Sequence, residues 1–204
     1  EGLPYVLIGK AYQNANQTVY VDNDNVLAGR EAASYLIRLG HRRIAYLSAD
    51  NSLLFAEDRK AGYLSALLEH GLPVQPEYCI EMNCDSEKRD EILKELLTSS
   101  QRPTAVLVSD DILAMLVANA CGSLKLAIPD DLSILSFNNS LFAQLSFPQL
   151  TSVDMNARQL GIEAAAQMIS HIENPGLPAT KIIVPHQLVE RKSCTALKEG
   201  IHYV

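Results

Sequence analysis

A regular alternation between strand-like and helix-like segments constrains the fold of this chain more than any other feature. Residues 43–47 and 104–108 are short apolar runs, and each is followed by a stretch whose apolar side chains recur every three or four positions. Strands and helices alternate in this way four times with short connections. This order predicts an α/β protein built on parallel sheet with right-handed crossovers. The predicted strands are 5–8, 18–21, 43–47, 78–82, 104–108, 132–137, 150–153, 181–184 and 187–189.

Capping residues and glycines predict where the helices begin and end. Asp22, Asn23 and Asp24 supply capping side chains for a helix that runs to Leu39 and stops at Gly40. Asp110 is placed to cap a second helix, which stops at Gly122, and Asp85 to cap a third through Ser99. The remaining helices are predicted at 57–70 and 157–172, and the apolar stretch 141–147 is predicted to be a loop.

Composition narrows the function classes. The net charge is −7 and the basic residues are scattered, so these 204 residues do not form the basic face that binding to a phosphate backbone requires. No apolar run approaches the ~18 residues of a membrane helix. The cysteines and histidines lack metal-ligand spacing, and we expect no metal and no cofactor. We expect a cytoplasmic protein with reduced thiols, with a Cys79–Cys84 disulfide as the alternative.

The loops that follow the predicted strands are rich in Asp and Asn and contain Arg59, and this is where α/β proteins bind ligands. They contain no nucleophile elbow, phosphate-binding loop or metalloprotease motif, so we do not expect an enzyme. Adjacent carboxylates such as Asp110 and Asp111 are more often a helix cap and its neighbour than an acid–base pair. Planar amide, carboxylate and guanidinium groups are suited to binding vicinal hydroxyls.

Arg59 and Asn138 each leave two interpretations open. Arg59 lies near the start of its helix, where the dipole disfavours a cation, so it needs either a ligand or an ion pair with Glu57, Asp58 or Asp110. Asn138 and Asn139 follow a predicted strand directly. Amides at such a place either form the turn or face a ligand.

Five stretches of the chain, taken in order, resemble the core domain of the lactose/galactose-repressor (LacI/GalR) family of bacterial transcription regulators. They are VDNDNVLAGREAASYLIRLGHRRIAYLS (21–48), DRKAGYLSALLEHGL (58–72), RPTAVLVSDDILA (102–114), IPDDLSILSFNN (128–139) and FPQLTSVDMNARQLGIEAA (147–165). The strings FNNS (137–140) and LIGK (7–10) are most similar to the maltose-type repressors of that family.

The resemblance implies a periplasmic-binding-protein-like fold, with two α/β lobes and a ligand cleft between them. Residues 1–21 and 154–186 would form part of the N-terminal lobe, and residues 22–153 and 187–204 the C-terminal lobe. The first lobe would be incomplete, and the helix-turn-helix headpiece of the family would be absent. The chain begins with EGLPYVLIGK and lacks an initiator Met, as a fragment or a processed product would.

The resemblance also implies an effector site. Arg59 matches the effector-binding arginine of the family, and Asp111 matches an Asp of the family motif. Asp110 stands where the family usually has Asn, and Asn138 where it more often has a sugar-binding Asp. Lys10 follows a glycine that replaces another frequent ligand residue. Because an amide donates as well as accepts, Asn138 implies a different effector from those of the lactose and galactose types.

A homodimer is the further implication. The helix after Asp110 is apolar nearly all round, and so is the stretch 141–147, and both lie where the family dimerises. The expected interface residues are Leu113, Leu116, Val117, Phe142 and Leu145. The alternative is that this helix is buried within its own lobe.

The function that these observations favour is the sugar-sensing, dimerising core of a bacterial transcriptional repressor. The expected effector is maltose or a related oligosaccharide, and operator DNA would be bound only through the missing headpiece. A transport-type sugar-binding protein is the alternative. A carbohydrate hydrolase has only the loop carboxylates in its favour.

Overall fold

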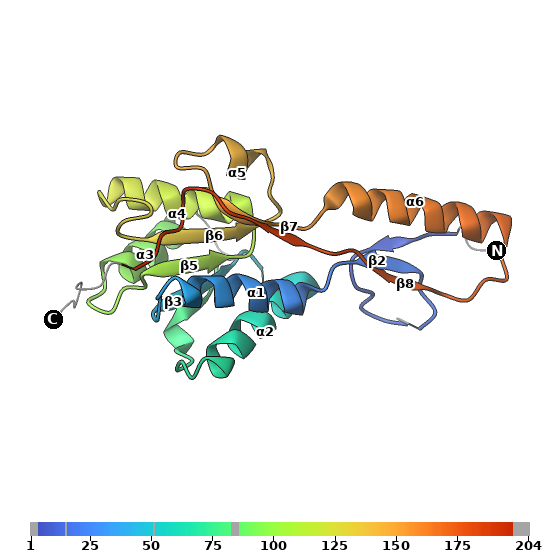
Figure 1. Ribbon diagram of the computed structural model, residues 1–204, viewed down its shortest axis with the longest axis horizontal. Helices are drawn as coiled ribbons and strands as arrows, with labels where there is room; N and C mark the ends of the chain where they lie inside the picture. The colour runs from blue at the N-terminus through green and yellow to red at the C-terminus, as the bar shows by residue number, and fades with distance from the viewer. Residues whose placement is uncertain (1–3, 15, 51, 83–85, 198–204) are drawn as a thin grey trace.

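The computed structural model of the chain describes residues 4–14, 16–50, 52–82 and 86–197, and its strands form two sheets (Figure 1). The larger sheet has the order β4-β3-β5-β6-β7-β9, and all its neighbours are parallel except β7 and β9, which are antiparallel. Its strands are β3 (Ile44–Ser48), β4 (Cys79–Glu81), β5 (Ala105–Val108), β6 (Ser133–Phe137), β7 (Thr151–Asp154) and β9 (Gln187–Val189). A 3-10 turn, η1 (Pro76–Tyr78), precedes β4.

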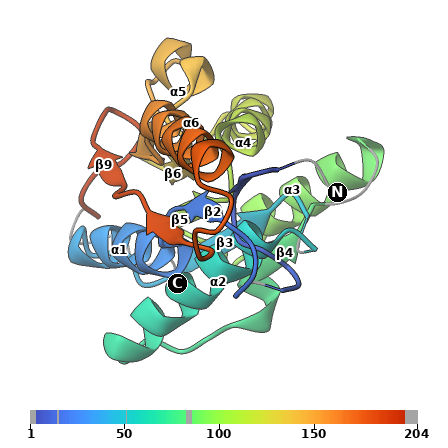
Figure 2. The same cartoon turned by 90° about the vertical axis from the view of Figure 1, so that its right-hand side faces the viewer.

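Helices cover both faces of the larger sheet, and each face has its own apolar core. Figure 2 shows α1 (Asn25–Arg38) and α2 (Leu54–Glu69) on one side of the strands and α4 (Asp111–Ser123) on the other. Side chains of β3 alternate between the two cores: Tyr46 packs with α1 and α2, whereas Leu47 packs with α4 and α3 (Ser86–Thr98). Burial on both faces explains why these strands read as continuous apolar runs.

The smaller sheet has the order β1-β2-β8 and is parallel. Its strands are β1 (Leu7–Ile8), β2 (Tyr20–Asp22) and β8 (Lys181–Ile183), and α6 (Ala157–Glu173) packs on it through Ala164. Within the described residues the chain passes between the sheets three times: from β2 to α1, from β7 to α6, and from β8 to β9. We call these three connections the crossings, and they lie at the centre of Figure 1.

The predicted α/β class is confirmed, and so are the caps of two helices. The Asp24 side chain accepts a hydrogen bond from the Leu27 amide at the start of α1, and Gly40 follows that helix with a φ of +92°. Asp110 caps α4. Asp85, the predicted cap of α3, lies outside the described residues.

Three local predictions were wrong. Helix α2 begins at Leu54, three residues before the predicted start, and has no side-chain cap at its N-terminus. The stretch predicted as a loop contains the short helix α5 (Leu141–Leu145), whose start is capped by Ser140. Strand β9 runs antiparallel to its neighbour in a sheet predicted to be parallel.

The remaining sequence expectations concern thiols and membranes. Cys79 is a free thiol, so the alternative disulfide to Cys84 is not formed; Cys84 itself lies outside the described residues. In the part of the chain that the structure describes, no helix combines the length and the apolar character needed to cross a bilayer.

Candidate functional site

A cavity of about 560 Å³ lies where the two sheets meet. Its walls come from the end of β1, the crossings from β2 to α1 and from β7 to α6, the start of α2 and the loop after β6. It is lined by Ile8, Gly9, Lys10, Asp22, Asn23, Asn25, Ser52, Leu53, Leu54, Phe55, Arg59, Asn138, Met155, Ala157 and Leu160. Three of the five predicted effector-binding residues, Lys10, Arg59 and Asn138, therefore line one cavity.

Arg59 is the most constrained side chain of this cavity, with 4% of its surface exposed. Its Nε donates to Asn25 Oδ1 at 3.0 Å, and its Nη1 donates to the Ser109 carbonyl at 2.7 Å. The guanidinium also lies over the Phe55 and Phe137 rings, at 4.8 and 4.4 Å from their centroids. A guanidinium carries five N–H donors, so these two contacts leave donors for a ligand.

The ion-pair interpretation of Arg59 is wrong. The ion pairs of the described residues do not include Arg59, and the Asp58 carboxylate is paired instead with Lys10. Burial lowers the pKa of Arg59 to about 10, against the opposing effect of Tyr46 and of Asp110, so the group is still protonated at neutral pH. A buried cation without a paired carboxylate is unusual, because its desolvation is only partly compensated by neutral acceptors.

Two glycines allow α1 and α2 to approach closely enough to place Arg59 beside Asn25. A Cβ on Gly29 would lie 2.2 Å from the Arg59 carbonyl oxygen, and one on Gly62 would lie 2.1 Å from the Val26 carbonyl oxygen. Any larger residue would push the helices apart. The close packing of backbone on backbone thus brings a residue of the first crossing to the guanidinium.

The first crossing and the residues at its two ends supply further polar groups to the cavity. Asp22 Oδ1 accepts from the Asn23 amide at 2.8 Å and from Asn25 Nδ2 at 3.3 Å. Burial raises the pKa of the Asp22 carboxyl, while the Asn23 amide and Arg59 act in the opposite direction. The Asn23 side chain points to the other two crossings, where it donates to the carbonyls of Met155 and Val184.

Lys10 reaches the site from the smaller sheet. It follows β1, and its Nζ lies 3.0 Å from both carboxylate oxygens of Asp58 on α2. The pair therefore joins the two sides of the cavity. Both side chains are partly open to solvent, where such a pair contributes only about 0–1 kcal/mol, so a ligand could displace it at low cost.

The structure separates the roles of the two adjacent asparagines after β6. Both have a left-handed backbone, with φ of +95° at Asn138 and +48° at Asn139. The Asn139 side chain is used internally: its Nδ2 donates to Asp154 Oδ2 at 2.9 Å and its Oδ1 accepts from Arg191 at 2.5 Å. The exposed Asn138 side chain lines the cavity. Asn139 shapes the turn and Asn138 faces the cavity.

Asp110 and Asp111, also predicted to bind the effector, do not line this cavity. Asp110 caps α4 by accepting from the Leu113 amide at 2.8 Å. Asp111 is 2% exposed and accepts from the hydroxyls of Ser136 and Ser152 at 2.5 and 2.9 Å. Asp111 therefore links α4 to β6 and β7, whereas Asp110 caps α4, and the structure brings neither carboxylate to this cavity.

Sequence reasoning missed Asn25 and Phe55 as site residues. Asn25 was not singled out beside the capping residues 22–24, and Phe55 lies before the predicted start of α2. Both lie in the first turn of a helix that follows a strand, so strand position was the available signal. Nothing local indicated that their side chains meet Arg59.

The predicted dimer residues divide into two groups. Leu113 and Val117 are buried in the core beneath α4, so they cannot form an interface, and Leu116 is partly packed against the same core. Phe142 and Leu145 are 53% and 80% exposed. The exposed apolar side chains of α5 and the residues after it, here called the α5 patch, are Leu141, Phe142, Leu145 and Phe147.

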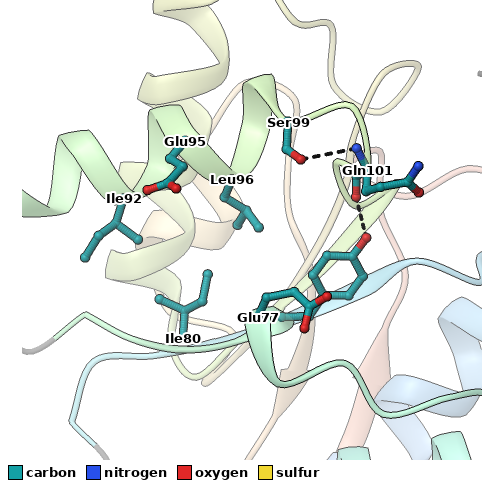
Figure 3. Close-up of a pocket in the computed structure, with 8 residues that line it drawn as sticks. Glu77, Ile80, Ile92, Glu95, Leu96, Ser99 and Gln101 are labelled. Carbon is teal, nitrogen blue, oxygen red and sulfur yellow. Dashed lines mark hydrogen bonds between the residues drawn. The ribbon is translucent and has the colours of Figure 1, made fainter.

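A second cavity, of about 340 Å³, lies between the edge strand β4 and α3 (Figure 3). Ile80, Ile92 and Leu96 form its apolar walls, and the Tyr78 hydroxyl donates to the Gln101 carbonyl at one end. None of the predicted site residues lines it. Within the described residues, no group of three or more His, Cys, Asp or Glu side chains is placed to hold a metal ion.

Comparisons with known proteins show which family this architecture belongs to. Residues 33–194 match the periplasmic binding protein-like domain family. The HTH-type transcriptional repressor ExuR of Bacillus subtilis is 30% identical over 97% of this chain and 59% of its own length. The HTH-type transcriptional regulator MalR of Staphylococcus xylosus is 30% identical over 97% of this chain and 57% of its own length. The chain therefore spans less than two thirds of these relatives.

Solved structures agree with the sequence relatives. A LacI transcriptional regulator from Bacillus cereus subsp. cytotoxis has a TM-score of 0.89 at 39% identity, covering 96% of this chain and 69% of that one. A cellobiose complex of the transcriptional regulator CelR has a TM-score of 0.86 at 26% identity, covering 94% and 59%. A LacI family regulator from Enterococcus faecium with bound ribose has a TM-score of 0.84 at 25% identity, covering 96% and 72%.

The match to the domain family covers most of the chain, and the sequence relatives and solved structures given above are all transcriptional regulators. The chain belongs to the periplasmic-binding-protein-like cores of the LacI family of transcriptional regulators.

Proposed function

We propose that this chain is the sugar-sensing, dimerising core of a bacterial transcriptional repressor, and that the effector binds in the cavity between the two sheets. The observation that carries the proposal is Arg59, a buried guanidinium that lines the cavity and is hydrogen-bonded only to neutral acceptors among the described residues. Fixed donors of this kind are suited to hydroxyl groups that accept in a defined direction.

The charges around the cavity favour a neutral effector. Lys10 is offset by Asp58, and the Asp22 carboxyl lies near enough to Arg59 for each to alter the pKa of the other. Amide groups that donate and accept, and apolar side chains such as Phe55, make up much of the remaining wall. Directional polar groups beside apolar ones fit a sugar, whose hydroxyls lie at the rim of an apolar ring face.

The relatives support a sugar of this kind and leave its identity open. The CelR structure contains cellobiose and the Enterococcus faecium regulator contains ribose. We propose maltose or a related oligosaccharide for this chain, because of its similarity to maltose-type repressors along FNNS and LIGK. MalR stands among its relatives.

We propose that a helix-turn-helix segment outside this chain binds the DNA. The chain itself spans only part of the length of its relatives and carries a net charge of −7, which does not favour contact with DNA. Effector binding would change how the two sheets sit about the crossings and so alter the spacing of the DNA-binding segments in a dimer. A transport-type sugar-binding protein is the second candidate. The codons upstream of this chain decide between them: a helix-turn-helix supports the repressor, and a secretory signal supports the transport protein.

The test begins with a thermal-shift screen of the full-length protein against glucose, maltose, maltotriose, trehalose, sucrose, cellobiose and ribose, because a ligand of the folded state raises the unfolding midpoint. The sugar that gives the largest rise is then titrated calorimetrically. We expect Arg59→Ala to weaken its binding by about 1.5–3 kcal/mol, roughly ten- to a hundred-fold, because charge-assisted hydrogen bonds are lost.

Two further variants make this result interpretable. Arg59→Met keeps an unbranched apolar side chain at the position where the guanidinium lies over the Phe55 and Phe137 rings, so it separates loss of the charge from loss of packing. Arg38→Ala removes an exposed arginine at the far end of α1 and should bind as the wild type does. Folded Arg59 variants with wild-type affinity would remove Arg59 from the site.

A further inference from the structure

One buried side chain joins all three crossings. Asn23, in the connection from β2 to α1, is 6% exposed, and its Nδ2 donates to the Met155 carbonyl at 3.0 Å and to the Val184 carbonyl at 2.8 Å. Met155 follows β7 and Val184 follows β8. The side-chain amide of Asn23 has two N–H bonds, and it donates one to each of the other two crossings.

This geometry constrains how the two sheets can move. The hydrogen bonds weaken steeply as they lengthen or bend, so both hold only while the three crossings keep nearly their present spacing. Breaking either bond would leave a buried carbonyl without its partner. We propose that Asn23, which also lines the cavity, is a positioning residue: its side-chain amide sets the relative placement of the smaller and larger sheets by binding the other two crossings.

A path of hydrogen bonds leads from this residue to Arg59. The Asn23 backbone amide donates to Asp22 Oδ1 at 2.8 Å, and the same oxygen accepts from Asn25 Nδ2 at 3.3 Å. Asn25 Oδ1 in turn accepts from Arg59 Nε at 3.0 Å. A ligand that moves the guanidinium therefore acts on the segment that carries Asn23. This coupling rests on the proposed effector site, whereas the positioning role does not.

Asn23→Asp tests the role with almost no change of shape, because it replaces the two-hydrogen donor by a carboxylate that faces two carbonyl oxygens. Asn174→Asp is the matched control: it makes the same change at the exposed end of α6, where the amide donates only to the Ser170 carbonyl at 3.4 Å. The readout is the distance distribution between spin labels on Ala61 of α2 and Glu173 of α6, both exposed. Labels carried on unnatural amino acids leave the native cysteines unmodified.

In the full-length protein without effector, we expect Asn23→Asp to shift or broaden this distribution and Asn174→Asp to leave it at the wild-type form. Asn23→Ser, with one shorter donor, should fall between them and serves if the aspartate variant does not fold. Effector affinity should fall roughly ten-fold or more in Asn23→Asp, because both buried hydrogen bonds that hold the walls of the cavity in place are lost.

One result would overturn the inference. A folded Asn23→Asp, or Asn23→Ser in its place, with the wild-type distance distribution shows that Asn23 only stabilises the fold, whether or not its unfolding midpoint is lower. If no sugar binds the wild-type protein, the proposed function fails, yet the effector-free distances still decide the role of Asn23.

Discussion

At the scale of single residues, the sequence indicated which residues belong to the site better than it indicated what their side chains contact. Arg59 and the pair Asn138–Asn139 were found from residue type and from their place after strands, and the left-handed backbone at both asparagines agrees with the turn chemistry. Which asparagine faces the cavity depends on Asp154 and Arg191, which close around Asn139 from distant segments. The local sequence does not indicate contacts between residues that lie far apart in the chain.

Asn138 yields a prediction at this scale. Asn138→Asp replaces a group that donates and accepts by one that only accepts, so we expect the ranking of sugars in calorimetric titrations to change. The free energy of unfolding should change little, because the side chain is exposed. Asn139→Ala should do the reverse, lowering that free energy by about 1–3 kcal/mol through its lost internal hydrogen bonds while keeping the ranking. An Asn138→Asp protein that is destabilised but ranks sugars as before would assign Asn138 to the turn alone.

At the scale of elements, periodicity and caps predicted most helices and strands, and the failures have physical reasons. Helix α5 spans only Leu141–Leu145, too few residues for a repeating pattern, and α2 begins without a side-chain cap that could mark it. The direction of β9 is set by its neighbour β7, which no local pattern encodes. One face of α4 is buried in the core of the larger sheet, whereas Ile112 on the same helix is 61% exposed. The larger group of exposed apolar side chains in this region belongs to α5 and the residues after it.

The α5 patch gives the prediction for this scale. We propose it as the dimer contact, and Leu145→Asp, at a side chain that is 80% exposed, should weaken association roughly ten-fold or more if this leucine is central to the interface. Sedimentation velocity over a concentration series measures the change. Leu68→Asp, at a similarly accessible leucine of α2, is the control and should leave association unaltered. Equal dimer stability in both variants would rule out the patch.

At the scale of the whole molecule, the α/β class followed from the alternation because few architectures accommodate it. The alternation of strands and helices did not predict the cavity. Its wall combines the end of β1, two of the crossings and the start of α2. Gly29 and Gly62 let two helices meet beside it, and Asn23 binds the other two crossings. The resemblance to a known family supplied that arrangement as an expectation, and the contacts now give it physical causes.

The most direct test of the effector site is a nuclear magnetic resonance titration of the isotope-labelled protein with the sugar selected by thermal shift. The Arg59 Nε–Hε signal is suitable because that proton is buried and hydrogen-bonded to Asn25. We predict that the signals of Arg59 Nε–Hε and of the Asn138 side-chain amide move together and saturate, while that of the Gln101 amide, in the cavity beside β4, stays fixed. Saturable binding that leaves Arg59 and Asn138 unmoved would contradict the proposed site.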